Sequence, residues 1–475
     1  MQIAMAFTTL TGKTEFYDFL HDCRWDDLPE AVQQRARICL LDLLGVAVVG
    51  RQTKSAQIAL DHAATMMAAG DGMPSATLLF DGRSASPAGA ALAGGMMIDS
   101  IDAHDGYKQV KGHAGCGVLP GLLAQLEAAD KAQGKGTSDK TDGKALLTHL
   151  AVGYELAIRC GLALHQSVSD YHTSGAWVAL AVAALGARIY GMDKATTREA
   201  VGIAEYHGPR SQMMRVIDHS SNLKDGSGWG AMVGVSAADM ARRGFTGAPA
   251  ITIEAEAETH LFTDLGSAWH IMDMYFKPWP VCRWAQPALQ AVLDLNAQSP
   301  IDPEQIESVQ IHTFHEATRL AAPHPKDTDQ AQYSICWPVA AALVAESEGR
   351  VFGPIDVMDD MLARADIHAL ADKIQLIDTA EISARFPDER FARVVVQFKN
   401  GEKRESELTK ATGDPEKPLG DPALITKFDQ YVENRLSKHS ASMLKAEILT
   451  MGLEHRSSDA FWEIISASFD ADSAR

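Results

Sequence analysis

Apolar residues recur at helical spacing through most of the first two-thirds of the chain. Ala, Leu, Val and Met return every three or four residues, which is the pattern of a helix that buries at least one face. Several of these segments are apolar nearly all round, so they must be buried on most sides, as in the centre of a large bundle or at an oligomer interface. The predicted helices run over Leu28–Val49, Ala85–Ile98, Leu119–Ala129, Ala145–Leu164, Ala176–Tyr190, Thr196–Tyr206 and Gly228–Arg243.

Start and stop signals support this division. Asp193 stands just before a helical run, where its carboxylate can accept hydrogen bonds from the free N–H groups of the first turn. Gly191 follows the preceding run, and glycine is common just after the last helical residue. Together the two residues predict the end of one helix and the start of the next.

The pattern changes after about residue 270. Residues 309–313 alternate between apolar and polar side chains, and residues 393–398 read Arg-Val-Val-Val-Gln-Phe, so both segments are predicted strands. Asn400-Gly401 follows the second strand, and Asn-Gly after an extended run is a strong hairpin signal because both central turn residues need positive φ. Helical spacing returns over Asp421–Leu436 and Ser442–Leu453.

These patterns predict a mainly α protein with two domains. The 475 residues exceed what one hydrophobic core usually organises, roughly 250–300 residues. We expect a large, discontinuous all-α helical domain over residues 1–269 and 413–475. A smaller α+β domain, residues 270–412, is expected to be inserted into it.

The net charge changes the expected partners. The chain carries a formal charge of −19 and has no Lys/Arg-rich run of the kind that binds phosphate backbones, so nucleic acid is not an expected partner. The same charge repels anionic metabolites at long range. Any acidic substrate must therefore be captured by a local cluster of cations inside a pocket.

Composition also bears on location and on metal binding. The longest apolar stretch, residues 176–187, is shorter than the roughly 20 residues that span a bilayer, and the N-terminus lacks the features of a secretory signal. We therefore expect a cytoplasmic protein without a membrane partner. The six cysteines form no C-x-x-C pair, which does not favour a disulfide framework, a zinc knuckle or an iron–sulfur cluster.

Ionisable residues concentrate between two of the predicted helices, over Ile98–His113. This stretch holds three Asp, two His and two Lys. Either a solvated linker or a functional loop would fit this composition. A metal site is a third possibility, since Asp and His are common ligands, but no H-E-x-x-H or similar helical pair is present.

Two further regions carry candidate chemistry. Residues 171–175 read Tyr-His-Thr-Ser-Gly at the entrance to a helix, where Thr173 or Ser174 could cap it and the N–H groups would favour an anion. Further on, Lys277 and Arg283 bracket two prolines, which restrict the backbone so that a cation could be held in a fixed direction. Taken singly, a histidine beside a cap or an isolated lysine is more often structural or exposed.

Together these stretches resemble the MmgE/PrpD family. The family's D-x-D-D-T…H-P-S…P block corresponds to Asp102-Ala103-His104-Asp105, Gly112-His113-Ala114-Gly115 and Val118-Leu119-Pro120. Further matches follow in order along nearly the whole chain. They are Gly153-Tyr154-Glu155, His172-Thr173-Ser174-Gly175, Leu223-Lys224, Gly244-Phe245-Thr246-Gly247 and Lys277-Pro278-Trp279-Pro280-Val281-Cys282-Arg283.

The resemblance implies a large helical domain with a smaller α+β lid and a site between them. Family members include 2-methylcitrate dehydratase, cis-aconitate decarboxylase and iminodisuccinate epimerase, which are commonly homodimers without a metal. The resemblance accordingly implies a homodimer that needs no cofactor or metal and binds a small anionic polycarboxylate. The implied catalytic residues are Asp102, His113, His172, Lys224 and Lys277, and the expected substrate contacts are Lys108, Lys111, Cys282, Arg283 and Trp337.

Three departures from the family pattern bear on the reaction. Gly106 stands where the decarboxylases carry Thr, Cys282 where they carry His, and Trp337 where they carry a lid Tyr. These departures do not favour decarboxylation of cis-aconitate. Sequence similar to K-P-Y-P-C-C-R recurs among epimerase-type relatives.

The reactions of the family share one physical problem, the removal of a proton from a carbon beside a carboxylate. Such a proton is very weakly acidic, so positive charge must stabilise the carboxylate while a placed base acts. We expect Lys224, Lys277 and His113 to supply the charge, and His172 and Asp102 to exchange protons. A close Asp102–Asp105 pair would raise one carboxyl pKa.

The expected function is therefore that of a metal-independent lyase, similar to 2-methylcitrate dehydratase, acting on a small di- or tricarboxylic acid. Two alternatives stay open. One is an epimerase of a dicarboxylate, similar to iminodisuccinate epimerase. The other is a non-catalytic dimeric protein that binds polycarboxylates.

Overall fold

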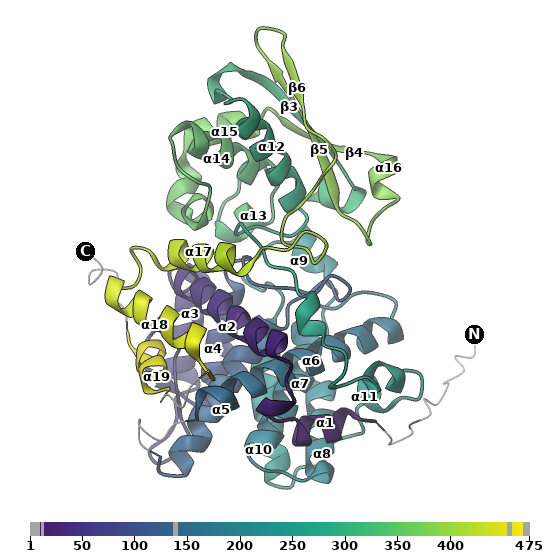
Figure 1. Ribbon diagram of the computed structural model, residues 1–475, viewed down its shortest axis with the longest axis vertical. Coiled ribbons are helices and arrows are strands. Elements are labelled where there is room, and N and C mark those ends of the chain that lie inside the picture. Colours follow the sequence, from purple (N-terminus) through teal and green to yellow (C-terminus); the bar gives the residue numbers. More distant parts are fainter. Residues whose placement is uncertain (1–9, 11–13, 136–140, 454–457, 469–475) are drawn as a thin grey trace.

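The computed structural model describes residues 10, 14–135, 141–453 and 458–468. Figure 1 shows two lobes, a large helical one and a smaller one that combines a sheet with helices. The prediction of a mainly α protein is confirmed. The other residues of the expected helical domain, 1–9, 11–13, 136–140, 454–457 and 469–475, lie outside the described part of the chain.

The large lobe is built by helices from both ends of the sequence. All seven helices predicted in the first two-thirds are present, with ends shifted by a few residues, and the C-terminal helix α17 packs against α2. The helices are α1 (Phe16–Asp22), α2 (Glu30–Gly50), α3 (Lys54–Met66), α4 (Pro87–Asp99), α5 (Gly115–Ala132), α6 (Gly143–Ser167), α7 (Gly175–Ile189), α8 (Lys194–His207), α9 (Met214–Asp218), α10 (Ser227–Arg242), α11 (Ile251–Glu254), α17 (Asp421–Val432), α18 (Lys438–Thr450) and α19 (Asp459–Ser466). A short hairpin, β1 (Ala76–Thr77) and β2 (Ser84–Ala85), lies between α3 and α4.

Helix α7 lies at the centre of this lobe. It packs against α5, α6, α8 and α10, and its residues from Gly175 to Ala187 are buried, as expected for a segment that is apolar all round. The approach of α10 is close enough to require glycine, because a Cβ on Gly230 would lie 2.4 Å from the carbonyl oxygen of Gly175. Both helix signals before α8 are confirmed. Asp193 accepts from the N–H of Thr196 at 2.7 Å, and Gly191 has φ +66°.

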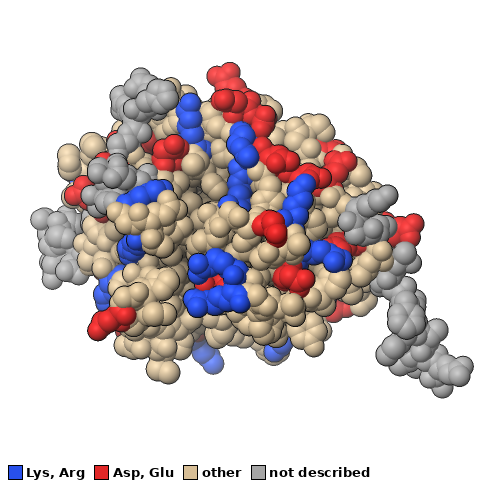
Figure 2. All heavy atoms as spheres, turned by 90° about the horizontal axis from the view of Figure 1, so that it is seen from below, with Lys and Arg blue, Asp and Glu red and all other residues tan. Residues whose placement is uncertain are grey.

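Helix α6 is long and apolar enough to cross a membrane by length and composition. Most of its apolar stretch is buried inside the lobe, where it packs on α2, α5 and α7. The core helix of a globular protein passes the same test, so α6 gives only weak support for a membrane span. Figure 2 shows the end of the large lobe farthest from the small lobe, where Lys and Arg side chains are interspersed with acidic ones.

The small lobe contains a mixed sheet in the order β4-β3-β5-β6, with β7 also paired to β5. The pairing of β3 with β4 is parallel, whereas β5 runs antiparallel to β3, β6 and β7. Helix α12 packs on β5, and α14 packs on α12. The strands are β3 (Ile306–Thr313), β4 (Ile374–Asp378), β5 (Phe391–Phe398), β6 (Lys403–Glu405) and β7 (Thr409–Lys410), and the helices are α12 (Gln286–Gln298), α13 (Thr328–Gln332), α14 (Cys336–Ser347), α15 (Ala365–Ala371) and α16 (Ala380–Ser383).

The hairpin predicted at Asn400-Gly401 is confirmed, but its turn differs from the expected one. Only Gly401 has positive φ, +87°. The N–H groups of Gly401 and Glu402 are both held locally, the first by the carbonyl of Phe398 at 2.9 Å and the second by the side chain of Asn400 at 2.9 Å. The connection is thus a three-residue loop with a glycine in the left-handed region, which also matches strand twist.

The lobes have separate hydrophobic cores. One core takes its residues from Phe16 to Phe276 and from Leu424 to Ile465, and the other takes its residues from Met213 to Phe398. Helix α9 belongs by sequence to the expected helical domain, yet its apolar side chains pack into the second core. The expected boundaries at 269/270 and 412/413 stay predictions.

Candidate active site

A small cavity between the lobes gathers most of the ionisable residues singled out above. Its volume is about 40 Å³, enough for a few water molecules but far below the roughly 300–1,000 Å³ of typical ligand pockets. A polycarboxylate therefore requires the lobes to move apart or the side chains to rearrange. The lining residues are Asp102, Lys111, His113, Met213, Val216, Ile217, Asp225, Tyr275, Lys277, Cys282, Arg283, Trp284, Tyr333 and Arg390.

Lys277 and Asp102 form a buried ion pair on the cavity wall. The Lys277 ammonium donates to the Asp102 carboxylate and, at 3.4 Å, to its carbonyl oxygen. Burial would raise the pKa of Asp102, but the Lys277 charge outweighs it and holds the pKa well below its usual value. A carboxylate that is kept ionised and paired in this way is a poor proton donor. The geometry favours Asp102 as the counterion that orients Lys277, rather than the proton-exchanging group we expected.

His113 faces the cavity as a neutral imidazole. Its Nδ1 lies 2.5 Å from the carbonyl oxygen of Asp105, which assigns the N–H to Nδ1 and leaves Nε2 with a free lone pair. Burial, with His104 and Lys277 nearby, lowers the pKa of His113 to about 3. In this arrangement His113 does not supply the positive charge that we expected of it. Its arrangement is instead that of a base.

Asp225 lies beside His113, with its Oδ2 3.7 Å from Nε2 of the imidazole. Burial raises the pKa of Asp225 to about 7, with the nearby Asp99 acting in the same direction. A carboxyl group that titrates near neutral pH can both give and take a proton. Ser174 does not cap α7 with its side chain; its hydroxyl accepts from the N–H of His113 and donates to Asp225.

Lys224 lies behind the cavity wall rather than on it. Its ammonium pairs with Asp329 at 2.9 Å and donates to Oε1 of Gln332 at 2.9 Å. The same Gln332 oxygen accepts from the N–H of Asp102, and its amide nitrogen donates to the carbonyl of Ser100. Gln332 of the small lobe thus forms hydrogen bonds with three residues of the large lobe.

The side chain of Tyr275 leaves no room for a side chain at Gly106. The two residues exchange backbone hydrogen bonds at 3.0 and 2.8 Å, and a Cβ on Gly106 would lie 2.3 Å from the Tyr275 hydroxyl and 2.9 Å from Nδ1 of His113. The space that a threonine would need is therefore filled by a phenol that also lines the cavity. This contact accounts for one of the departures from the family pattern.

The cavity wall also holds the cluster of cations that the negative net charge requires. Lys111, Lys277, Arg283 and Arg390 line it together, and Arg283 pairs with Asp414 at 2.6 Å. The thiol of Cys282 is neutral, because burial raises its pKa to about 12.

Besides Lys224, three expected site residues do not line the cavity. Trp337 is buried in the core of the small lobe, where its indole N–H donates to the carbonyl of Asp356 at 2.9 Å, so the expected substrate contact stays a prediction. Lys108 pairs with Glu416 at 3.0 Å. His172 is half-buried and its N–H donates to Nε2 of His165 at 3.1 Å, so its role in proton exchange stays a prediction.

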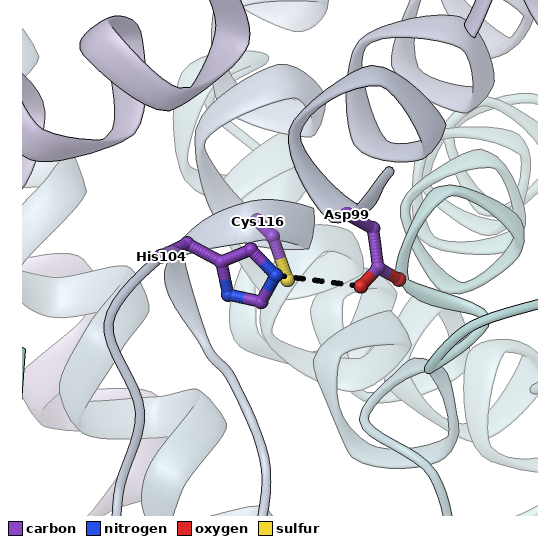
Figure 3. A group of neighbouring side chains, drawn as sticks. All are labelled: Asp99, His104 and Cys116. Atoms are coloured by element: carbon purple, nitrogen blue, oxygen red, sulfur yellow. Dashed lines mark ion pairs between the residues drawn. The ribbon is translucent and has the colours of Figure 1, made fainter. Parts of the chain in front are cut away.

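Three potential metal ligands lie together behind His113. The ligand atoms of Asp99, His104 and Cys116 are within 4.8 Å of one another, and Figure 3 shows the imidazole and thiol pointing toward the carboxylate. Asp99 and His104 form an ion pair at 3.4 Å, and burial raises the pKa of the Cys116 thiol well above its usual value. A metal needs the thiolate, and structural zinc sites use four ligands. The donor set therefore fits a zinc ion poorly.

The buried carboxyl group of Asp105, next to the cavity, makes the stability of the protein depend on pH. Burial raises its pKa to about 7, and the second contribution in that direction comes from Asp42, whereas we expected Asp102 to cause the shift. The folded protein keeps this proton up to about pH 7, while the unfolded chain loses it near the ordinary pKa of an aspartic acid, 3.8. The carboxyl group's contribution to stability is thus complete at low pH and falls as pH rises through this window.

We expect the Asp105→Asn variant to gain stability relative to the parental protein as pH rises from about 4 to about 7. The gain in the free energy of unfolding should be on the order of 1.4 kcal/mol per pH unit. Urea unfolding of both proteins across this range measures it. A difference between the two proteins that does not change with pH would contradict the assignment.

Two family models match most of the chain. Residues 14–264 match the MmgE/PrpD N-terminal domain, and residues 279–452 match the MmgE/PrpD C-terminal domain. A cis-aconitate decarboxylase of Aspergillus terreus is 23% identical over 441 residues, covering 84% of each chain. A cis-aconitate decarboxylase-like protein of Aspergillus oryzae is 22% identical over 478 residues, covering 90% of this chain and 93% of that protein.

Proposed function

Because the chain belongs to the MmgE/PrpD family, we propose that it is a lyase that removes a proton beside a carboxylate of a small di- or tricarboxylic acid. The observation that carries the proposal is the meeting of a paired ammonium, a neutral imidazole and a protonatable carboxyl in one buried cavity. The relatives named above, a cis-aconitate decarboxylase and a cis-aconitate decarboxylase-like protein, support a lyase in general. The homodimer that the resemblance implies stays a prediction.

Each group has a role that its surroundings support. Nε2 of His113 takes the proton from carbon, since its lone pair is free and the Asp105 carbonyl holds the tautomer. The Lys277 ammonium, oriented by Asp102, stabilises the charge that develops on the carboxylate. Asp225 gives a proton to the departing hydroxyl.

The spacing of His113 and Asp225 favours elimination over epimerisation. A proton-transferring group must approach its target within about 2.6–3.2 Å, so two groups on opposite faces of one carbon stand roughly 6 Å apart. Nε2 and Oδ2 are 3.7 Å apart. They are suited to adjacent atoms on one side of the substrate, as in a dehydration. Decarboxylation is the second candidate, favoured by the relatives.

The proposal is tested by following citrate, 2-methylcitrate, aconitate, itaconate and iminodisuccinate by NMR in D₂O. Dehydration is expected with at least one of them, seen as new alkene signals, with deuterium returned to the carbon in the reverse direction. Release of labelled CO₂ would identify a decarboxylase, and deuterium uptake without net reaction an epimerase. Binding without exchange would show the non-catalytic alternative and contradict the proposal.

The same assay tests independence from metals. We expect protein dialysed against EDTA to keep its full rate, because the donor set behind His113 fits zinc poorly. A rate that is lost on dialysis and restored by zinc or iron would contradict that expectation.

A further inference from the structure

Arg390 is a buried guanidinium with unused donors. It directly precedes β5, is 4% exposed and lines the cavity. Its Nη2 donates weakly to the carbonyl of Lys108 at 3.4 Å, but Nε and Nη1 are buried and have no hydrogen-bond partner in the described part of the chain. Arginine keeps its charge in proteins, so a buried guanidinium with free donors invites an anion.

The other cations of the cavity fall into two groups. Lys277 and Arg283 are neutralised by Asp102 and Asp414. Within the described residues, Lys111 joins Arg390 in having no carboxylate within 4.0 Å. Neither cation is therefore directly paired. The carboxylates that stabilise them, Asp388 and Glu316 for the half-buried Lys111 and Asp414 for Arg390, act from farther away. A buried guanidinium without a paired anion is costly.

Lys111 is held in place by an unusual backbone. Its φ is +49°, in the left-handed region that side-chain-bearing residues seldom adopt, and the Tyr107–Gly112 bridge closes the loop around it. Its Nζ lies 3.1 Å from the centre of the Tyr171 ring. Burial and the nearby Arg390 lower the pKa of Lys111 to about 8.

We propose that Arg390 and Lys111 bind a second carboxylate of the substrate, remote from the carboxylate that Lys277 stabilises. This inference rests on the proposed function and deepens it, because it assigns one carboxylate of the substrate to two particular side chains. The guanidinium can hold a carboxylate through two parallel N–H donors. Since Arg390 comes from the small lobe and Lys111 from the large one, the bound anion would also join the lobes.

Binding of succinate and butyrate tests the subsite without turnover. The two acids share a four-carbon chain and differ by one carboxylate, and calorimetry on the full-length protein measures both. We expect the parental protein to bind succinate more tightly than butyrate. Arg390→Gln should weaken succinate at least about 30-fold and leave butyrate unchanged, the fold-change expected when one partner of a buried charge pair is removed.

Two further variants separate recognition from folding. Lys111→Gln removes the second cation from a loop and should also weaken succinate selectively. Arg393→Gln, a matched control on β5, removes an exposed arginine that pairs with Glu405 and should change neither affinity. Without ligand, Arg390→Gln should melt no lower than the parental protein, because the buried cation that it removes has no directly paired carboxylate in the described part of the chain.

Several outcomes would overturn the subsite. These are equal binding of succinate and butyrate by the parental protein, unchanged succinate affinity in Arg390→Gln or Lys111→Gln, or a lowered melting temperature in Arg390→Gln together with retained succinate binding. The proposed function fails separately. A protein that binds succinate through Arg390 but exchanges no proton in D₂O has the subsite without the activity, and the reverse result shows the activity without the subsite.

Discussion

The Lys277→Met variant is expected to lose turnover by roughly 10²–10³-fold, the usual effect of removing one donor that stabilises developing negative charge. It should also be less stable by about 3–5 kcal/mol, because Asp102 is left as an unpaired buried carboxylate. The two losses can be separated. Adding Asp102→Asn removes the stranded charge, so the double variant should recover most of the stability and none of the turnover.

A second buried pair provides the control for Lys277. Lys427 and Asp42 pair at 2.6 Å in the large lobe, outside the cavity lining. Lys427→Met should destabilise the protein to a similar extent but lower turnover less than tenfold at a temperature where it is folded. Rates are measured by NMR and stabilities by urea unfolding. A Lys277→Met enzyme with the parental rate, or a double variant that regains turnover, would contradict the role given to the ammonium.

The His113→Asn variant should lose turnover by roughly 10²–10⁴-fold, since that is the typical contribution of a placed general base. Asparagine can offer an amide N–H where Nδ1 lies and so keep the hydrogen bond to the Asp105 carbonyl. It has no equivalent of Nε2. Deuterium exchange at the substrate carbon should therefore be lost together with net turnover, while the melting temperature changes little.

His149 is a matched control for this substitution. It is a largely buried histidine of α6, its Nδ1 also lies 2.5 Å from a backbone carbonyl, that of Ala145, and burial lowers its pKa to about 4. It does not line the cavity. His149→Asn should keep the parental exchange rate. If both variants exchange deuterium equally fast, the proton is taken by another group.

The helices could be predicted from the sequence because their pattern is local. Spacing of apolar residues and the signals at Gly191 and Asp193 depend only on neighbours in the chain, and they located α7 and α8 to within two residues. The turn at Asn400-Gly401 shows the limit. A hairpin follows from the sequence, but the loop length depends on the register of β5 with β6, which is set by packing.

The site could be predicted only in part, for the same reason. Motifs supplied Asp102, His113, Lys277 and Arg283, which the fold brings to one cavity. The charge states could not be predicted, because the pKa of His113 depends on burial by distant elements. Arg390 was missed altogether. An arginine before a strand carries no local signal, and its free donors exist only once the two lobes meet.

Gln332 makes the surroundings of two site residues depend on contact between the lobes. Its carboxamide forms hydrogen bonds with Lys224, with the N–H of Asp102 and with the carbonyl of Ser100, so all three groups would be exposed to solvent if the lobes separated. The hydrogen-bonded surroundings of Asp102 and Lys224 are therefore complete only while the small lobe contacts the large one.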